Sequence, residues 1–538
     1  MVKSRVVIVC VLLAISLQYA FAQDNYYFVS FTNKLGNGFS VDQPEAYLSQ
    51  RAIERRTKQG IFIEEQDLPI SSSYRQSIAN SGVEIFESSK WLNGIIVKAT
   101  QAEADQFKSE SFVEDVEYLA PVNYSGRSKN EKKLTKVNEA ASDSIFQNQI
   151  LGIAEMHNEG FYGQGMLVAL MDGGYYGMDS AEPFDHLYSN NQVAYTYDFI
   201  SKTSNVYQYS SHGTQVLSLM AAEKDNLYQG IIPEASFMLF VTENVPTEYR
   251  IEEYYWLIAA ERADSAGVDV ISTSVGYNTF DDPSMNYSKQ DLDGITSVVS
   301  RAAHIASEKG IVVVSSAGNE GVTSWGTINF PSDIINGLAV GSIQTDYGLS
   351  IFSSSGPSAD GRVKPDVVAM GSNIFVINST GNVAINNGTS FSAPQVAGLA
   401  AGVWEAYPSM SYLDVLNAIR MSADNAASPD NDFGYGIPSF IAIKNYASSI
   451  EVHEPVLVYP NPIVNGELLT VKVVDPTKSD KIKLELFEAS GKQLTAVTFG
   501  VSWRDNEAVV ELKHLPQGLY FLKVLFESES EEFRIVKL

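Results

Sequence analysis

The segment Gly388-Thr389-Ser390-Phe391-Ser392-Ala393-Pro394 decides how the rest of this sequence is interpreted. It places a serine directly after a glycine turn, at the start of a predicted helix that continues to Trp404. Pro394 is expected in the first turn of that helix, where its missing N–H costs little. A single serine in such a place is usually only a helix cap. The whole pattern is rare by chance, and a hydroxyl at the positive end of a helix can serve as a nucleophile.

A serine hydroxyl becomes a good nucleophile only when a nearby base takes its proton. Among the six histidines of the chain, His212 stands out, because it heads a predicted helix in the pattern Ser211-His212-Gly213-Thr214. A carboxylate must then orient the imidazole and stabilise its charged form. Asp172 is the candidate, because it follows a buried apolar run, where a charge needs a partner.

The order of these residues along the chain narrows the class of enzyme. The order Asp172, His212, Ser390 is one of three known orders for this triad on unrelated folds. A lipase or esterase would have a Gly-x-Ser-x-Gly turn and the order Ser, Asp, His, so the sequence contradicts that class. Asn319 follows another predicted strand. Its amide, with the Ser390 N–H, could donate hydrogen bonds to the oxyanion of a tetrahedral intermediate.

Apolar strands alternate with helical stretches between residues 145 and 446. The predicted strands include Met166–Met171, Val268–Ser272, Ile311–Ser315 and Leu338–Val340, and the predicted helices include His212–Ala222, Glu252–Ala266 and Gln290–Lys309. This alternation predicts an α/β domain with a mostly parallel sheet and helices on both faces. Functional residues of such sheets gather at the carboxyl ends of the strands.

Together these segments resemble the subtilase family of serine proteases. The resemblance implies a three-layer subtilisin-like fold and a serine endopeptidase that acts on proteins or peptides through an acyl-enzyme, without a cofactor. It also implies two segments that flank the bound substrate, which would bind by adding a strand. These substrate-binding residues are Ser274, Val275 and Gly276 in one segment and Ser316, Ala317 and Gly318 in the other.

Two features depart from the usual pattern of that family. Gly173 follows Asp172 where a serine or threonine is usual, so the carboxylate is expected to depend on backbone donors. The segment Ala221–Ile231 is short and lacks an obvious run of calcium ligands, so no metal site is assigned. A structural calcium ion is conceivable at a group of acids further along the chain, although a solvated loop is favoured; they are Asp281, Asp282, Asp291 and Asp293.

The N-terminus has the pattern of an export signal. Basic residues precede the apolar run Val6–Leu17, and Ala20-Phe21-Ala22 supplies a small-x-small cleavage site, so residues 1–22 are predicted to be a signal peptide. The single cysteine, Cys10, lies inside it, and the mature chain is expected to have no disulfide and no thiolate chemistry. The net charge of −27 argues against nucleic-acid binding. No later segment is apolar and long enough to predict a transmembrane helix.

Residues 23–122 have the pattern of a separate small domain. The predicted order of elements is βαββαβ, the split-βαβ arrangement of an α+β fold. Residues 123–144 are polar and rich in charge, including Arg127 and Lys132-Lys133, which predicts an exposed linker that a protease can cut. The resemblance to subtilases implies that 23–122 is a propeptide that inhibits the peptidase domain, residues 145–446.

The pattern changes again in residues 456–538, where short predicted strands are separated by turn residues. This predicts a small all-β sandwich. The unit resembles the C-terminal sorting domain of type IX secretion in Bacteroidetes through several segments, which are Tyr459-Pro460-Asn461-Pro462, Gly491-Lys492, Leu515-Pro516, Gly518-Leu519-Tyr520 and Val536-Lys537-Leu538. It implies interaction with that secretion machinery, then release or attachment to the cell surface. An adhesive or carbohydrate-binding sandwich remains an alternative.

A second function from another class is also compatible with the sequence. Because Gly173 removes a supporting hydroxyl, the chain could be a catalytically inactive subtilase fold that serves as a binding module at the cell surface.

Overall fold

The computed structural model describes residues 24–122, 135–136 and 146–450, and parts of 456–537. The chain divides into two compact units, Met1–Lys444 and Asn445–Leu538, and each is described by itself. The predicted signal peptide and most of the predicted linker lie outside the described residues.

A seven-stranded sheet forms the centre of the first unit, and all its neighbouring strands are parallel. Its strands are almost continuously apolar, as expected for a sheet covered on both faces. In spatial order they are β14 (Val367–Met370), β13 (Leu338–Ile343), β12 (Val312–Ser316), β11 (Val270–Thr273), β6 (Leu167–Asp172), β10 (Ser236–Val241) and β7 (Val193–Asp198).

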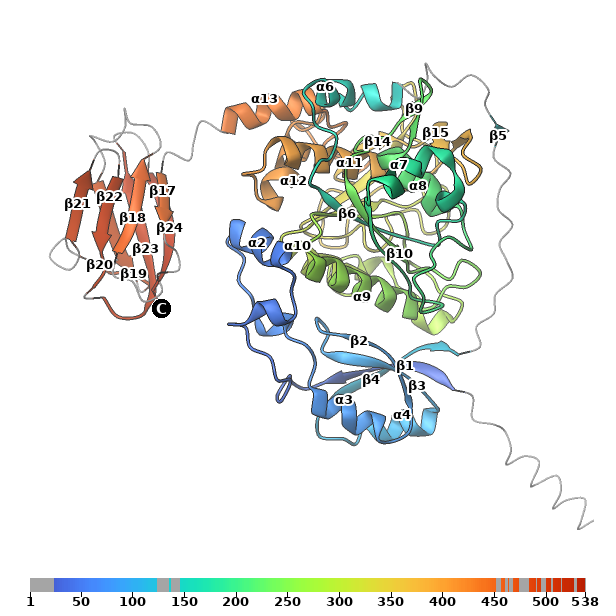
Figure 1. The fold of residues 1–538 in the computed structure, drawn as a ribbon, viewed down its shortest axis with the longest axis horizontal. Coiled ribbons are helices and arrows are strands. Elements are labelled where there is room, and N and C mark those ends of the chain that lie inside the picture. Colours follow the sequence, from blue (N-terminus) through green and yellow to red (C-terminus); the bar gives the residue numbers. More distant parts are fainter. Residues whose placement is uncertain are drawn as a thin grey trace, which may run out of the picture. The chain divides into compact units, whose positions relative to one another are not determined.

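Helices cover both faces of this sheet, which gives three layers (Figure 1). Helices α8 (His212–Ala221) and α11 (Thr389–Ala406) pack together on one face, and α9 (Ile251–Ala266) and α10 (Val298–Glu308) pack together on the other. The predicted α/β fold is therefore confirmed. Helix α10 begins later than predicted, because the Ser297 side chain accepts a hydrogen bond from Ser300 N and caps it.

Helix α11, which contains Ser390, begins one residue before that serine. Because α11 begins at Thr389, Pro394 lies in the second turn, and the prediction that it lies in the first turn is wrong. A residue at position 394 would normally donate its N–H to the carbonyl of Ser390, which proline cannot do. The Ser274 hydroxyl donates to that carbonyl instead, at 2.8 Å, and so allows the proline.

Residues 25–121 form a four-stranded antiparallel sheet in the order β2-β3-β1-β4, the predicted split-βαβ arrangement. Its elements are β1 (Asn25–Phe31), α2 (Gln50–Lys58), α3 (Ser72–Ala79), β2 (Glu84–Ser89), β3 (Gly94–Ala99), α4 (Gln101–Phe107) and β4 (Val113–Pro121). Helix α3 was not predicted, because its mostly polar sequence gives only a weak apolar pattern.

This N-terminal sheet and α2 pack against α9. The rings of Phe28 and Tyr254 are 4.6 Å apart within a shared apolar cluster. Two guanidinium groups of α2 reach the buried carboxylate of Asp264, where Arg55 Nη2 and Arg56 Nη2 each lie 2.7 Å from an oxygen. Burial alone would raise the pKa of Asp264, but the charges of Lys90, Arg56 and Arg55 hold it below its ordinary value. Asp264 is therefore ionised and fully compensated.

The second unit contains two four-stranded antiparallel sheets with a common apolar core. One has the order β17 (Val456–Tyr459), β18 (Leu468–Val473), β22 (Glu507–Glu511), β21 (Gly500–Arg504), and the other has the order β20 (Gln493–Leu494), β19 (Lys483–Glu488), β23 (Gly518–Leu525), β24 (Ser530–Lys537). This is the predicted all-β sandwich.

Apart from short 3-10 helices, the remaining described elements are those outside the two large sheets of the first unit, the helices named above and the sandwich. They are α6 (Ile153–Asn158), α7 (Asp185–Ser189), α12 (Tyr412–Met421), α13 (Phe440–Ile450), β5 (Thr135–Lys136), β8 (Glu223–Lys224), β9 (Tyr228–Gln229), β15 (Ile374–Ile377) and β16 (Val383–Asn386). No helix in the described part of the chain is long and apolar enough to cross a membrane.

Candidate active site

Asp172 and His212 form a close pair at one edge of the central sheet. Asp172 is the last residue of β6 and is almost fully buried. Both of its carboxylate oxygens lie 2.9 Å from His212 Nδ1, and one also accepts the Gly173 N–H at 2.7 Å. The expected backbone support of the carboxylate is therefore present in the structure.

His212 is the first residue of α8, and the glycine after it permits its position. A side chain on Gly213 would approach Gly174 O to 2.6 Å, so only glycine lets the helix start lie against the Asp172 loop. Burial opposes protonation of the imidazole, but the Asp172 carboxylate, and more weakly Glu243, raise the pKa of His212 above its ordinary value.

Ser390 is the second residue of α11 and lies in the same cavity as Asp172 and His212, a cavity of about 460 Å³. Its hydroxyl donates to Ser274 O at 3.2 Å. In this resting geometry the hydroxyl proton is thus directed to a carbonyl and not to the imidazole. The backbone N–H of Ser390 belongs to the first helical turn, where N–H groups have no partner inside the helix.

Asn319 lies beside the start of α11 with its amide held in one orientation. Its Oδ1 accepts hydrogen bonds from Thr389 N at 2.9 Å and from Thr389 Oγ1 at 3.1 Å. This leaves the Nδ2 group, which lies next to Gly388, as the donor that faces the Ser390 region. The predicted pair of oxyanion donors, Asn319 Nδ2 and Ser390 N–H, is therefore brought together at one helix start.

Two segments beyond parallel strands β11 and β12 form walls of this cavity. Its lining includes five of the six predicted substrate-binding residues, which are Ser274, Val275, Gly276, Ser316 and Gly318. Ala317 does not line it. The Ala317 N–H donates to Val340 O and its carbonyl accepts from Asn329 N, and its role in substrate binding stays a prediction.

Several lining residues were missed at the level of sequence. Glu243 and Glu248 follow β10, Glu320 follows Asn319, and Asn329 lies opposite Gly276. The signal for the first two was the apolar run Phe237–Val241, which marks a buried strand whose carboxyl end must lie at the same edge as Asp172.

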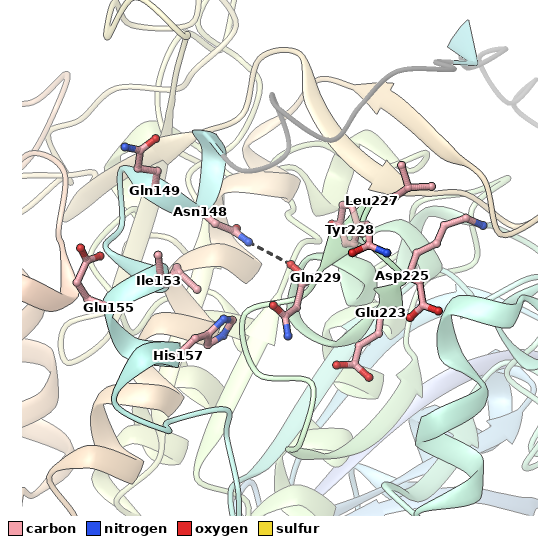
Figure 2. A pocket seen from close by; sticks show the side chains of 13 residues that line it. Asn148, Gln149, Ile153, Glu155, His157, Glu223, Asp225, Leu227, Tyr228 and Gln229 are labelled. Atoms are coloured by element: carbon pink, nitrogen blue, oxygen red, sulfur yellow. Dashed lines mark hydrogen bonds between the residues drawn. The ribbon is translucent and has the colours of Figure 1, made fainter.

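A larger cavity of about 760 Å³ lies elsewhere on the first unit and contains no residue of the triad. Figure 2 shows its walls, with Asn148 and His157 on one side and the β8–β9 hairpin on the other. Asn148 Nδ2 donates to Gln229 O at 3.1 Å, and His157 Nε2 lies 2.8 Å from Ile231 O. These two contacts join the opposite sides of the cavity directly.

Metal-binding groups are sparse in the part of the chain that the structure describes. The one set of three close carboxylates there is Glu243, Glu248 and Glu252, whose oxygens lie within 4.8 Å of one another. Asp282 and Asp293 each accept hydrogen bonds from their own loops, and Asp291 caps Ser288. These acids therefore have structural roles in their loops.

The profile of the Subtilase family matches residues 163–436, just over half of the 538 residues. The chain therefore belongs to the subtilase family. Residues 26–136 match the Peptidase S8 propeptide domain of Bacteroidota, and residues 457–537 match the secretion system C-terminal sorting domain. The sorting domain indicates that the chain is secreted or attached to the cell surface.

Subtilisin E of Bacillus subtilis (strain 168) is 30% identical over 286 residues, which cover 52% of this chain and 65% of that protein. The match thus spans slightly less than two thirds of that relative. A subtilisin of Bacillus pumilus is 29% identical over 284 residues and is covered to 90%.

Among solved structures, the epidermin leader peptide processing serine protease of Staphylococcus aureus, in a serine-to-alanine mutant, has a TM-score of 0.55. The alignment covers 78% of this chain and 99% of that one, at 15% identity, and bears on the fold alone.

Proposed function

We propose that this chain is a secreted serine endopeptidase that hydrolyses peptide bonds of proteins with Ser390, His212 and Asp172. The observation that carries the proposal is the Asp172–His212 pair, with 2.9 Å between carboxylate and Nδ1, in one cavity with Ser390. A carboxylate on Nδ1 leaves Nε2 as the basic nitrogen of the neutral ring.

The first chemical step requires the Ser390 hydroxyl to turn from the Ser274 carbonyl to His212 Nε2. His212 then takes the proton as Ser390 Oγ attacks the scissile carbonyl carbon. Asp172 stabilises the imidazolium that forms. Asn319 Nδ2 and the Ser390 N–H donate to the oxyanion, and they are stronger donors to this charge than to the ground-state carbonyl.

The second half of the reaction follows from the same groups. His212 gives its proton to the leaving amine, and the acyl group remains on Ser390 Oγ. A water molecule, deprotonated by His212, then attacks the acyl carbon. The bond to Ser390 Oγ breaks, His212 returns the proton to Oγ, and the acyl part leaves as a carboxylic acid. An extended peptide would bind between segments 274–276 and 316–318 as an added strand.

Two further proposals concern partners. Residues 23–122 would act as an inhibitor of the chain's own peptidase domain, supported by the propeptide match and by the packing of β1 and α2 on α9. The C-terminal sandwich would be the part that the type IX secretion machinery recognises, supported by the sorting-domain match.

Labelling with a fluorophosphonate probe tests the enzymatic proposal. We expect the exported, matured protein to be labelled at Ser390 and the Ser390→Ala variant to remain unlabelled. A folded wild-type protein that stays unlabelled would contradict the proposal and favour the inactive binding module.

A further inference from the structure

The cavity that contains Ser390 has acidic walls. Besides Asp172, its lining includes Glu243, Glu248 and Glu320. A smaller cavity of about 300 Å³ shares Glu248 and Glu320 with it and adds Asp281. All lining residues of both cavities belong to the described part of the chain, and none of them is lysine or arginine.

Hydrogen bonds fix the Glu243 carboxylate and the backbone at Glu248 and Glu320. Tyr277 donates its hydroxyl to Glu243 Oε1. The Glu248 N–H donates to the Asp281 carboxylate at 3.2 Å, and the Asp281 N–H donates back to the Glu248 carbonyl at 2.9 Å. Glu320 is anchored by its N–H, which donates to Ser354 Oγ at 3.0 Å. The acidic residues are therefore part of the ordered walls of this cavity, which we call the cleft.

Arg250, which follows Glu248 in the chain, forms its contacts with other groups. Arg250 pairs with Glu117 at 3.1 Å and donates to Met285 O, while its guanidinium stacks over the ring of Tyr287. Beneath the wall, burial and the charges of Glu243 and Glu248 raise the pKa of Glu252 well above its ordinary value. The carboxylates thus repel one another, and a cationic guest would relieve this repulsion.

The chain itself contains a segment of the opposite charge. The linker between the propeptide and the peptidase domain carries Arg127, Lys129, Lys132 and Lys133 within seven residues, with Glu131 as the one acid among them. The whole chain, by contrast, has 64 acidic and 37 basic residues. Separation of the propeptide requires a cut in this linker, so cleft and linker are complementary in charge.

We propose that the cleft selects peptides with lysine or arginine side chains next to the scissile bond, and that the basic linker is its first substrate. This inference rests on the proposed endopeptidase function and names its substrate class. Ser390, His212 and Asp172 cut the peptide bond, and the cleft carboxylates determine which substrate side chains bind beside it. With the peptide backbone along segments 274–276 and 316–318, a long cationic side chain can extend to Glu243, Glu248 or Glu320.

Two internally quenched peptides with the sequence of residues 123–134 test the proposal. One carries arginine at its four basic positions, and the other carries citrulline, which has nearly the same shape and no charge. For the matured enzyme we expect kcat/KM to be at least about tenfold higher for the arginine peptide, a typical value for several half-exposed charge pairs. In a Glu243→Gln, Glu248→Gln, Glu320→Gln variant this ratio should fall towards one.

A matched control removes the same charge from elsewhere on the domain. Glu155→Gln, Glu223→Gln and Asp225→Asn change three acids in the walls of the larger cavity shown in Figure 2, away from the triad. This variant should keep the wild-type ratio. If it lowers the ratio as much as the cleft variant does, the general charge of the protein explains the selectivity and the proposal is overturned.

The possible failures can be told apart. If neither peptide is cut and the fluorophosphonate does not label Ser390, both proposals fall. If Ser390 is labelled but both peptides are cut equally, only the substrate class is wrong. The assay is run in a chelator and again in calcium, and a preference that calcium abolishes would identify the carboxylates as a metal site and overturn the proposal.

The full-length chain gives an independent readout. Replacing Arg127, Lys129, Lys132 and Lys133 with glutamine should slow separation of the propeptide by about the same factor as in the peptide assay, as followed on gels. Separation at the wild-type rate and position would overturn the inference that the linker is recognised by charge.

Discussion

Ser274 and Ser390 exchange hydrogen bonds in both directions: Ser274 Oγ donates to Ser390 O at 2.8 Å, and Ser390 Oγ donates to Ser274 O at 3.2 Å. The first bond replaces the one that Pro394 cannot make. The second holds the nucleophile in a resting orientation. Because a bound peptide would also seek the Ser274 carbonyl, substrate binding and the release of the Ser390 hydroxyl are linked at this atom.

Removal of the Ser274 hydroxyl should therefore affect stability as well as turnover. Ser274→Ala removes the hydroxyl that donates to the Ser390 carbonyl, which is expected to cost about 1–3 kcal/mol of unfolding free energy. Urea unfolding of the chain in a Ser390→Ala background measures this cost without self-digestion. Ser274→Thr keeps a hydroxyl and should recover most of it, and equal losses in both variants would contradict the role given to the hydrogen bond.

Asn319→Ala should lower kcat by about 10²–10³ with little change in KM, because the amide acts on the oxyanion and not on the ground state. Steady-state kinetics on the linker peptide measure both constants. Thr389→Val keeps the shape of the side chain but removes the hydroxyl that holds Asn319 Oδ1 at 3.1 Å, and we expect a smaller fall in kcat. A rise in KM alone would assign Asn319 to substrate binding.

The acid limb of the pH profile should reveal the charges around His212. The imidazole must be neutral to accept a proton, and its pKa is raised above the ordinary value. Activity is therefore expected to fall as the pH drops through a pKa above that of a free histidine. Glu243→Gln removes a negative charge, lowers this pKa and moves the limb to lower pH. The citrulline peptide is the appropriate substrate, because it lacks the cationic side chains that would contact Glu243 directly, and an unmoved limb would refute the coupling.

We expect the space for a side chain at position 173 to depend on the size of the side chain at position 245. A Cβ on Gly173 would approach Val245 Cγ2 to 2.7 Å, so Gly173→Ser alone forces a shift and should reduce kcat/KM. Gly173→Ser with Val245→Ala restores the space and adds a hydroxyl beside Asp172. We expect the double variant to equal or exceed the wild type. Two losses that simply add would show that the residues are independent.

The buried charges between α2 and α9 should stabilise the unprocessed chain. Asp264→Asn leaves Arg55 and Arg56 buried with too little compensation, which is expected to cost about 3–5 kcal/mol. Thermal or urea unfolding of the full-length Ser390→Ala chain measures this. Asp105→Asn breaks the exposed pair with Lys108 and should cost far less, because water screens an exposed ion pair. Similar costs for the two variants would contradict the importance of burial.

Much of the fold could be predicted from the sequence, because its strands are buried on both faces and appear as short apolar runs. The same logic placed Asp172 at a strand end, and the structure brings it to His212, although the roles of these residues stay predictions. Pro394 was misplaced because its partner, the Ser274 hydroxyl, is distant in sequence.

The sequence around a residue also could not predict contacts that other segments of the chain provide. The backbone partners of Ala317, which are Asn329 and Val340, are distant from its own segment and could not be identified from the sequence around it. Glu243 and Glu320 were missed because a single acid after a strand looks like any turn residue. The two carboxylates act on the same site only because the fold brings both into the wall of one cavity.

The ion pairs of Arg55 and Arg56 with Asp264 also separate two events in time, which are cleavage of the linker and departure of the N-terminal domain. A cut in the linker breaks the chain but leaves these ion pairs and the apolar packing around Tyr254 intact. We expect the severed N-terminal domain to leave slowly, because Arg55, Arg56 and Asp264 must regain their hydration when it does. The lifetime of this nicked complex, more than the speed of cleavage, would therefore set the delay between export and the first attack on other proteins.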